Sequence, residues 1–455
     1  MRRWLLLASL LALSGPLAAQ PLAFGSADDP LEADTDLGGL ARAGVLALAG
    51  PSYLPDEWRT AVRLDVAAAS GRWSAAVGTT LHSGSPLYGP EADEPYDALR
   101  ALRYARLNPT RRQRTYLRVG PTERQTLGVG ALVQGYRTTT AWDERLVGVE
   151  AAVAGRRLRL GAFTDDVALS GVVGAEIGLT TGLAAGPLRR IGVVGAGVHD
   201  LAQPGLARDS SLTGYEVVLR GDLRRGGPVI LSPFVAHAGY LDHGGTVGAG
   251  LDARLADVGD ALRATGRLAV FGSSARFVPG HVGPFYSIGN VEERIVDDGA
   301  FFQPDFDPEA ADVLVGTPLD SLSGGVDVVL DLRVVAFGRL VASQHIRRHI
   351  GDDAASAYSV RLGGTFPNGA RAEFTLERQG FRGFFDLIDD LGDENTLLLD
   401  VAFPVGRVGY VFVRSRYGYR RLTEDDGTAF AEAAPPRYLV ERRFEPLAGV
   451  RLAIR

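Results

Sequence analysis

Short segments in which every second residue is apolar recur along most of the chain, and they constrain its fold more than any other feature. In residues 370–377, apolar side chains alternate with the polar or charged set Arg371, Glu373, Thr375 and Glu377. Residues 126–136 repeat the alternation, with Leu127, Val129, Ala131 and Val133 on one face. A period of two is that of a β-strand with one wet face. Segments of about ten residues match a tilted membrane-spanning strand, whereas soluble strands usually have about five or six.

Two kinds of connection separate these segments. Tight turns such as residues 367–369 and 404–406 alternate with long polar loops, including residues 83–114 and 278–320. Short turns at one end and long loops at the other are typical of an outer-membrane barrel with an even number of strands. With residues 83–114 counted as one outer loop, the pattern indicates about 20 strands, within a range of about 16 to 22. We therefore predict an all-β fold, a transmembrane antiparallel up-and-down β-barrel over residues 37–455.

Residues 1–19 have the three parts of a secretory signal peptide. Arg2 and Arg3 give a basic start, residues 5–13 are apolar, and small residues precede a predicted cleavage after Ala19. The apolar run is shorter than the roughly 20 residues that a transmembrane helix needs. We expect export through a cleaved signal peptide, followed by a short periplasmic segment over residues 20–36.

The strand segments carry charge on one face only. Residues 215–220, 247–254, 326–333 and 397–403 each place apolar side chains on one face and Asp, Glu or Arg on the other. In a membrane barrel the apolar face contacts lipid and the other face lines the interior. The sequence therefore predicts a charged lumen.

These features together resemble the outer-membrane β-barrel superfamily, which includes porins. The resemblance rests on the signal peptide, the alternating segments and the rhythm of short turns and long loops, and it covers almost the whole mature chain. It implies a location in the cell outer membrane, lipid and lipopolysaccharide around the barrel, and insertion by the barrel-assembly machinery. Whether the chain forms a homo-oligomer is left open.

The composition argues against several kinds of chemistry. The chain has no cysteine, which excludes disulfides and thiolate sites, and its net charge of -6 argues against a nucleic-acid partner. Residues 190–200 start like a dinucleotide-binding turn, but Asp200 stands where the third glycine is needed, so we interpret them as a strand. His345 and His349 lack further ligands and are interpreted as loop-edge residues. No nucleophile elbow is present, so we predict no enzyme activity, no cofactor and no metal site.

The loop over residues 83–114 contains the candidate site. Arg100, Arg103 and Arg106 are spaced three residues apart between Asp97 and Pro109, as in a short capped helix with one arginine stripe. Residues 103–106 fit a hairpin with residues 115–118 equally well. In either form, the loop is a candidate to enter the lumen as a pore constriction whose three arginines favour anions. A solvated outer loop is the alternative.

Two functions of different classes remain open. One is a porin-like passive channel for small polar or anionic solutes. The other is a closed-lumen barrel that serves as a surface receptor, an adhesin or a component of envelope or secretion machinery. Matched inward charges would close a barrel, whereas an excess of one sign would keep it open. Acidic clusters in the outer loops, at residues 91–94, 297–298, 305–309, 389–394 and 425–426, are interpreted as solvated surface, with divalent-cation binding as the alternative.

Overall fold

Most strand segments of the sequence lie in one continuous wall in the computed structural model. The structure describes residues 43–54, 57–70, 72–83, 96–107, 115–122, 124–140, 146–155, 157–169, 171–181, 188–201, 212–223, 229–241, 243–255, 262–286, 323–337, 340–351, 356–381, 395–406, 408–421 and 438–454. The predicted signal peptide, residues 20–36 and the acidic loop clusters lie outside these ranges. Within them, no helix is long and apolar enough to cross a membrane.

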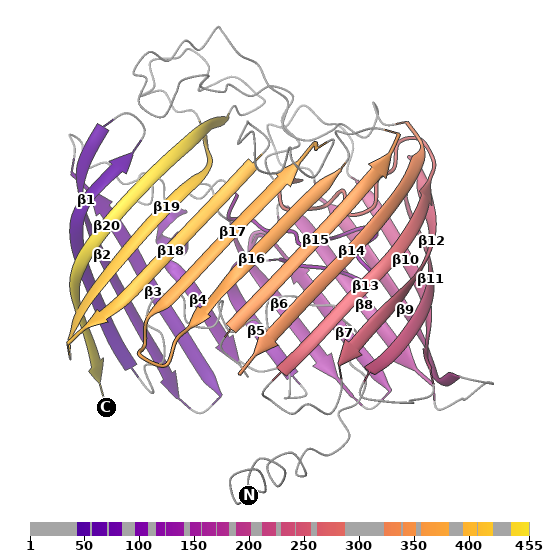
Figure 1. The fold of residues 1–455 in the computed structure, drawn as a ribbon, viewed down its shortest axis with the longest axis horizontal. Helices are drawn as coiled ribbons and strands as arrows, with labels where there is room; N and C mark the ends of the chain where they lie inside the picture. The colour runs from indigo at the N-terminus through magenta and orange to yellow at the C-terminus, as the bar shows by residue number, and fades with distance from the viewer. Residues whose placement is uncertain are drawn as a thin grey trace, which may run out of the picture.

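Twenty antiparallel strands form a single sheet that closes on itself (Figure 1). The first ten are β1 (Ala43–Leu54), β2 (Glu57–Ser70), β3 (Trp73–His82), β4 (Leu102–Leu107), β5 (Thr115–Pro121), β6 (Val147–Ala154), β7 (Leu158–Thr164), β8 (Val172–Thr180), β9 (Leu188–Asp200) and β10 (Thr213–Leu223). The others are β11 (Val229–Tyr240), β12 (Gly245–Leu255), β13 (Leu262–Ser273), β14 (Gly325–Ala336), β15 (Leu340–Ile350), β16 (Ala357–Thr365), β17 (Arg371–Gln379), β18 (Asn395–Val405), β19 (Gly409–Arg421) and β20 (Tyr438–Ile454).

Each strand pairs with its sequence neighbours, and a seam between the first and last strands completes the barrel. At this seam β1 pairs antiparallel with β20, with Ala43 opposite Ile454 and Tyr53 opposite Phe444. Closure leaves no strand edge unpaired, as a sheet in lipid requires. The predicted antiparallel up-and-down barrel and its strand number are both confirmed.

The two rims of the barrel differ in the length of their connections. The rim where β1 begins and β20 ends carries short turns, such as residues 155–157, 366–370 and 406–408. The opposite rim carries the long connections, including residues 122–146 and 274–324. We call these the short-turn rim and the long-loop rim. Their asymmetry is that predicted from the sequence.

The two faces of the sheet differ as predicted. On β10, Tyr215, Val217 and Leu219 are 41 to 49% exposed on the outer face, whereas Glu216 between them is 1% exposed on the inner face. Asp327 on β14 is likewise buried, whereas its neighbour Val326 is 41% exposed on the outer face. The outer wall is therefore apolar and the charged side chains point into the lumen.

Aromatic side chains gather near both rims of the outer wall. Towards the long-loop rim, Tyr53 and Phe444 lie edge-on to Trp58, at ring-centroid distances of 5.4 Å and 6.4 Å. Trp73 and Phe337 are exposed at the short-turn rim. Aromatic girdles above and below an apolar band are typical of membrane barrels because such rings favour the interface with water.

Two segments depart from their predicted structure. Residues 83–114 are not one outer loop, because β4 lies within them and forms a hairpin with β5 that pairs Arg106 with Arg118. Of the two forms predicted for this part of the chain, the hairpin with residues 115–118 is confirmed, and the helical form is limited to α2 (Asp97–Arg100). Residues 126–136 are not a strand. Gly128, Gly130 and Gly135 have positive φ angles of 55°, 82° and 66°, which an extended strand does not allow.

Replacing Leu268 with Arg should destabilise the barrel by about 2–4 kcal/mol, the usual cost of Arg or Lys at the lipid-facing midplane. Leu268 is 56% exposed on the outer face in the middle of β13. Thr265→Arg on the lumen face of the same strand is the matched control and should cost far less. Denaturant titration of refolding into vesicles measures both, and an equal cost for the two variants would contradict the assignment of the faces.

Candidate functional site

Two chain segments from the long-loop rim fold into the lumen. Residues 124–140 follow β5, and residues 275–286 follow β13; we call them the first and second inner segments. They meet at a bridge between Val133 and Val282 and bury their apolar side chains against the inner wall. Leu132, for example, is fully buried, and its carbonyl accepts a hydrogen bond from the Tyr240 hydroxyl of β11 at 3.2 Å. The apolar alternation that predicted a strand over residues 126–136 instead packs these segments inside the barrel.

Carboxylates of the β8–β10 wall hold the tip of the first inner segment. The backbone N–H groups of Gly128 and Val129 donate to Glu176 at 2.8 Å and to Glu216 at 2.6 Å, respectively. A Cβ at Gly128 would clash with the Glu216 carboxylate, and the φ angle there also favours glycine. The close approach of backbone to carboxylate therefore depends on this glycine.

Tyrosine hydroxyls attach both inner segments to the same wall. Tyr136 of the first segment donates a hydrogen bond to Asp165, which follows β7, and Tyr286 of the second donates to Asp200 of β9 at 2.7 Å. Burial raises the pKa of Tyr136 well above its usual value, and the nearby Asp165 charge raises it further. The phenol therefore stays protonated and remains a donor at neutral pH.

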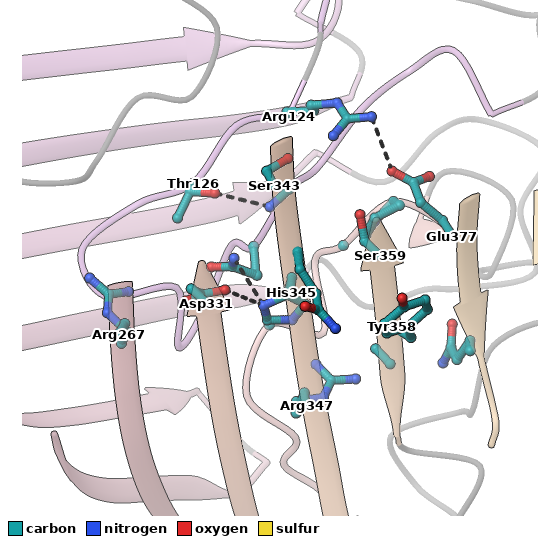
Figure 2. Close-up of a pocket in the computed structure, with 18 of the residues that line it drawn as sticks. Arg124, Thr126, Arg267, Asp331, Ser343, His345, Arg347, Tyr358, Ser359 and Glu377 are labelled. Atoms are coloured by element: carbon teal, nitrogen blue, oxygen red, sulfur yellow. Dashed lines mark hydrogen bonds and ion pairs between the residues drawn. The ribbon is translucent and has the colours of Figure 1, made fainter. Parts of the chain in front are cut away.

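The first inner segment is also attached to the opposite wall. Arg137 Nη2 lies 2.6 Å from Glu377 Oε2 of β17, and Arg124 Nη2 lies 3.7 Å from Glu377 Oε1. Figure 2 shows Arg124 on the inner segment pointing across to Glu377 on the wall. With one end at β8–β10 and the other at β17, the segment crosses the lumen.

The cavities beside the first inner segment include one of about 230 Å³ and one of about 130 Å³. The segment therefore narrows the barrel without filling it. Arg124 lines both cavities. The larger one, drawn in Figure 2, has a mixed lining that includes Asp331, His345 and Tyr286.

The smaller cavity, which we call the arginine chamber, has a strong excess of positive charge. Within the described part of the chain, two carboxylates line it, Glu373 and Asp400. Nine arginines line it, namely Arg63, Arg103, Arg118, Arg124, Arg137, Arg361, Arg414, Arg416 and Arg443. Such a lining concentrates anions because low-dielectric walls focus the field of like charges.

Pairs of arginines that share one carboxylate explain how this excess is tolerated. Each such group holds two guanidiniums in place around one carboxylate. Four of the described carboxylates on the inner wall are shared in this way: Asp65 by Arg63 (2.6 Å) and Arg103 (3.7 Å), Glu373 by Arg361 (2.6 Å) and Arg371 (3.6 Å), Glu377 by Arg137 (2.6 Å) and Arg124 (3.7 Å), and Asp252 by Arg267 (2.7 Å) and Arg220 (2.9 Å).

The three arginines predicted to form a constriction lie on the inner side of the barrel, at different heights. Arg100 is buried at the end of α2, over the ring of Tyr96, and Arg106 on β4 donates to the Ser74 hydroxyl at 3.3 Å. Arg103 lines the arginine chamber, whereas the other two lie outside its lining. The remaining chamber arginines were missed because they come from several strands and from the first inner segment, and no local sequence pattern joins them.

The two histidines are not at the edge of a loop, as predicted, but within β15. His345 Nδ1 lies 2.5 Å from Asp331, and His349 Nδ1 lies 3.0 Å from Asp327. Each histidine stands directly opposite its aspartate in the register of β14 and β15. Among the described residues, no three His, Cys, Asp or Glu side chains gather as a metal site would need.

Residues 190–200, predicted as a strand, form most of β9.

The fold defined by these observations is that of an outer-membrane-type β-barrel with inner segments in its lumen. No family model matches the chain, and no curated protein matches it significantly. Among solved structures, it is similar to OpdL of Pseudomonas aeruginosa, with 11% identity, 90% of this chain and 98% of that chain covered, and a TM-score of 0.30.

Two further solved structures show the same level of similarity. OccAB2 of Acinetobacter baumannii has 12% identity and a TM-score of 0.28 over 91% of this chain and 98% of that one. A mutant ferric enterobactin receptor, PfeA of Pseudomonas aeruginosa, has 10% identity and a TM-score of 0.32 over 92% of this chain and 82% of that one. Sequence identities and TM-scores this low support no inference about function. The residues of the lumen are the basis for the function proposed below.

Acidification should strengthen the attachment of the first inner segment through Asp165. Burial raises the pKa of Asp165 from 3.8 to about 6, although hydrogen bonds from Tyr136 and Val172 oppose the shift. The closed state therefore binds this proton more tightly than an opened one, and the resulting stabilisation is lost as pH rises through 6. Between pH 7.5 and pH 5, the free energy of opening should increase by about 1 kcal/mol.

Hydrogen exchange of residues 124–140, corrected for the intrinsic pH dependence of amide exchange, measures this effect. Asp165→Asn should abolish the pH dependence while keeping an acceptor for Tyr136. The same pH dependence in both proteins would show that Asp165 is not its source.

Proposed function

We propose that this protein is a porin-like channel of the outer membrane that passes small anionic solutes by passive diffusion. The observation that carries the proposal is the arginine chamber, where nine arginines face two carboxylates across the path through the barrel. Guanidiniums stay charged at any physiological pH and match carboxylate and phosphate oxygens geometrically. A solute that carries such groups is favoured there over a cation or a neutral molecule of the same size.

The pairing of charges supports an open channel over a closed-lumen receptor or adhesin. A barrel closed by salt bridges would match its charges one to one, whereas here a carboxylate such as Asp65 is shared by Arg63 and Arg103. The excess of arginines over carboxylates in the chamber lining would be costly in a dry, closed core, because taking guanidiniums out of water carries a large desolvation penalty. It is tolerated in a lumen that water and anions can enter.

Under this proposal, the apolar outer wall contacts outer-membrane lipid and lipopolysaccharide, and the barrel-assembly machinery inserts the exported chain. Diffusion requires no bond chemistry, so the proposal assigns no catalytic residue. Of the arginines predicted from sequence, Arg103 is the one that we assign to the constriction, together with Arg118 and Arg416 from neighbouring parts of the chamber lining.

Single-channel recording in a planar bilayer tests the proposal. The purified barrel should conduct steadily, and its reversal potential under a salt gradient should show anion preference. Arg103→Gln should weaken that preference because it removes one charge of the chamber. Arg100→Gln, outside the chamber lining, is the matched control and should leave the preference nearly unchanged. A folded barrel that conducts nothing, or one that prefers cations, would contradict the proposal.

Asp65→Asn should have the opposite effect on selectivity. The substitution keeps the side-chain shape but removes the negative charge that Arg63 and Arg103 share, so the chamber gains one net positive charge. Reversal potentials should shift further towards the anion value, and Asp65→Glu, which keeps the charge, should not cause that shift. A shift of Asp65→Asn towards cations would mean that Asp65 serves only to orient its two arginines.

A further inference from the structure

The wall opposite the arginine chamber is acidic, and the inner segments cover it. We define this acidic wall as Asp165, Asp166, Glu176, Asp200 and Glu216, which lie on β8, β9, β10 and the connection after β7. The side chains are well separated in sequence, but the order of neighbouring strands brings them to one side of the lumen. The lumen thus has a positive side that solutes can reach and a negative side under a cover.

The inner segments give these carboxylates uncharged donors. Backbone N–H groups of the first inner segment donate to Glu176 and Glu216, and tyrosine hydroxyls of the two segments donate to Asp165 and Asp200. Tyr96, which precedes α2, donates to Asp166 at 2.8 Å. Arg159 lies 3.8 Å from Glu176. Glu176 and Glu216 are 3% and 1% exposed, so solute in the lumen does not contact them.

Neutral donors replace the hydrogen bonds of water but do not cancel the charge of a carboxylate. If the cover were absent, water and counter-ions would reach the wall directly. Fixed charges act on mobile ions over roughly 8–10 Å at physiological salt, a distance comparable to the width of a constriction. An uncovered acidic wall would therefore attract cations into the same lumen.

We infer that the first inner segment sets the ion selectivity of the channel by covering the acidic wall, in addition to narrowing the lumen. This inference rests on the proposed channel function. With the segment in place, the accessible lining is that of the arginine chamber, and anions are preferred. Without it, Glu176 and Glu216, which accept hydrogen bonds from its backbone, join the lining, and the preference changes towards cations.

A segment that acted only as a steric constriction would behave differently. Its removal would increase conductance but leave the sign of the selectivity unchanged, because the arginines of the β2–β5 and β16–β20 walls would still dominate. The sign of the reversal potential therefore separates the two roles. The size of the conductance alone does not.

The experiment replaces residues 126–135 with a short Gly-Ser linker and records single channels in a potassium chloride gradient. The replacement keeps Arg124 and Arg137 at the opposite wall. Conductance should rise, and the permeability ratio of chloride to potassium should fall from above unity to below it. A deletion variant that conducts more but remains anion-selective to the same degree as the intact protein would overturn the inference.

The matched control carries the same replacement together with Glu176→Gln, Glu216→Gln and Asp165→Asn. Its conductance should also rise, but its anion preference should persist because the carboxylates that the replacement uncovers are no longer charged. A cation preference in this control would likewise overturn the inference. If the intact protein itself fails to conduct or prefers cations, the proposed function fails first, so the two failures are distinguishable.

A point substitution provides a second route if the replacement does not fold. Gly128→Val leaves the chain length unchanged, but its side chain would clash with the Glu216 carboxylate and displace the tip of the segment. Anion preference should weaken in this variant relative to the intact protein. Heat-modifiable migration confirms that the barrel is folded, and a folded Gly128→Val channel with unchanged selectivity would contradict the inference.

Discussion

The requirement that every backbone polar group be paired without water determines the architecture of this protein. A sheet in hydrocarbon satisfies that requirement only when it closes, which it does here through the pairing of β1 with β20. Closure gives the sheet an outside that contacts lipid and an inside that does not. The period-two alternation of the sequence then places apolar side chains on the outside and charged side chains on the inside.

The interior shows how a barrel of 20 strands can hold many charged side chains in its lumen and remain stable. Arginines share carboxylates in fixed groups, and the first inner segment crosses from the acidic wall to Glu377, attached at both ends by hydrogen bonds and ion pairs. The lumen is therefore divided into a covered negative side and an accessible positive side. The size and the charge of the path through the barrel depend on the same segment.

The sequence predicted the wall of this barrel better than its contents. Alternation and turn rhythm are local signals, so strands such as β10 and β17 could be recognised from their own residues. The inner segment was mistaken for a strand because Leu127, Val129 and Val133 also alternate; the positive φ angles at Gly128 and Gly130 are what exclude a strand. The arginine chamber joins residues as distant as Arg63 and Arg443. Only the strand register brings such residues together, and no local pattern encodes it.

The location of the first inner segment is the central claim, and thiol accessibility tests it most directly. The chain has no cysteine, so a single cysteine can be introduced at Val133, which is fully buried, or at Leu169, which is 59% exposed. The labelling rate of each variant with a membrane-impermeant maleimide would be measured in the folded barrel. We expect the cysteine at position 133 to react far more slowly than the one at position 169, and at a similar rate only after unfolding. Equal rates in the folded protein would contradict the account, because they would mean that the segment lies outside the lumen.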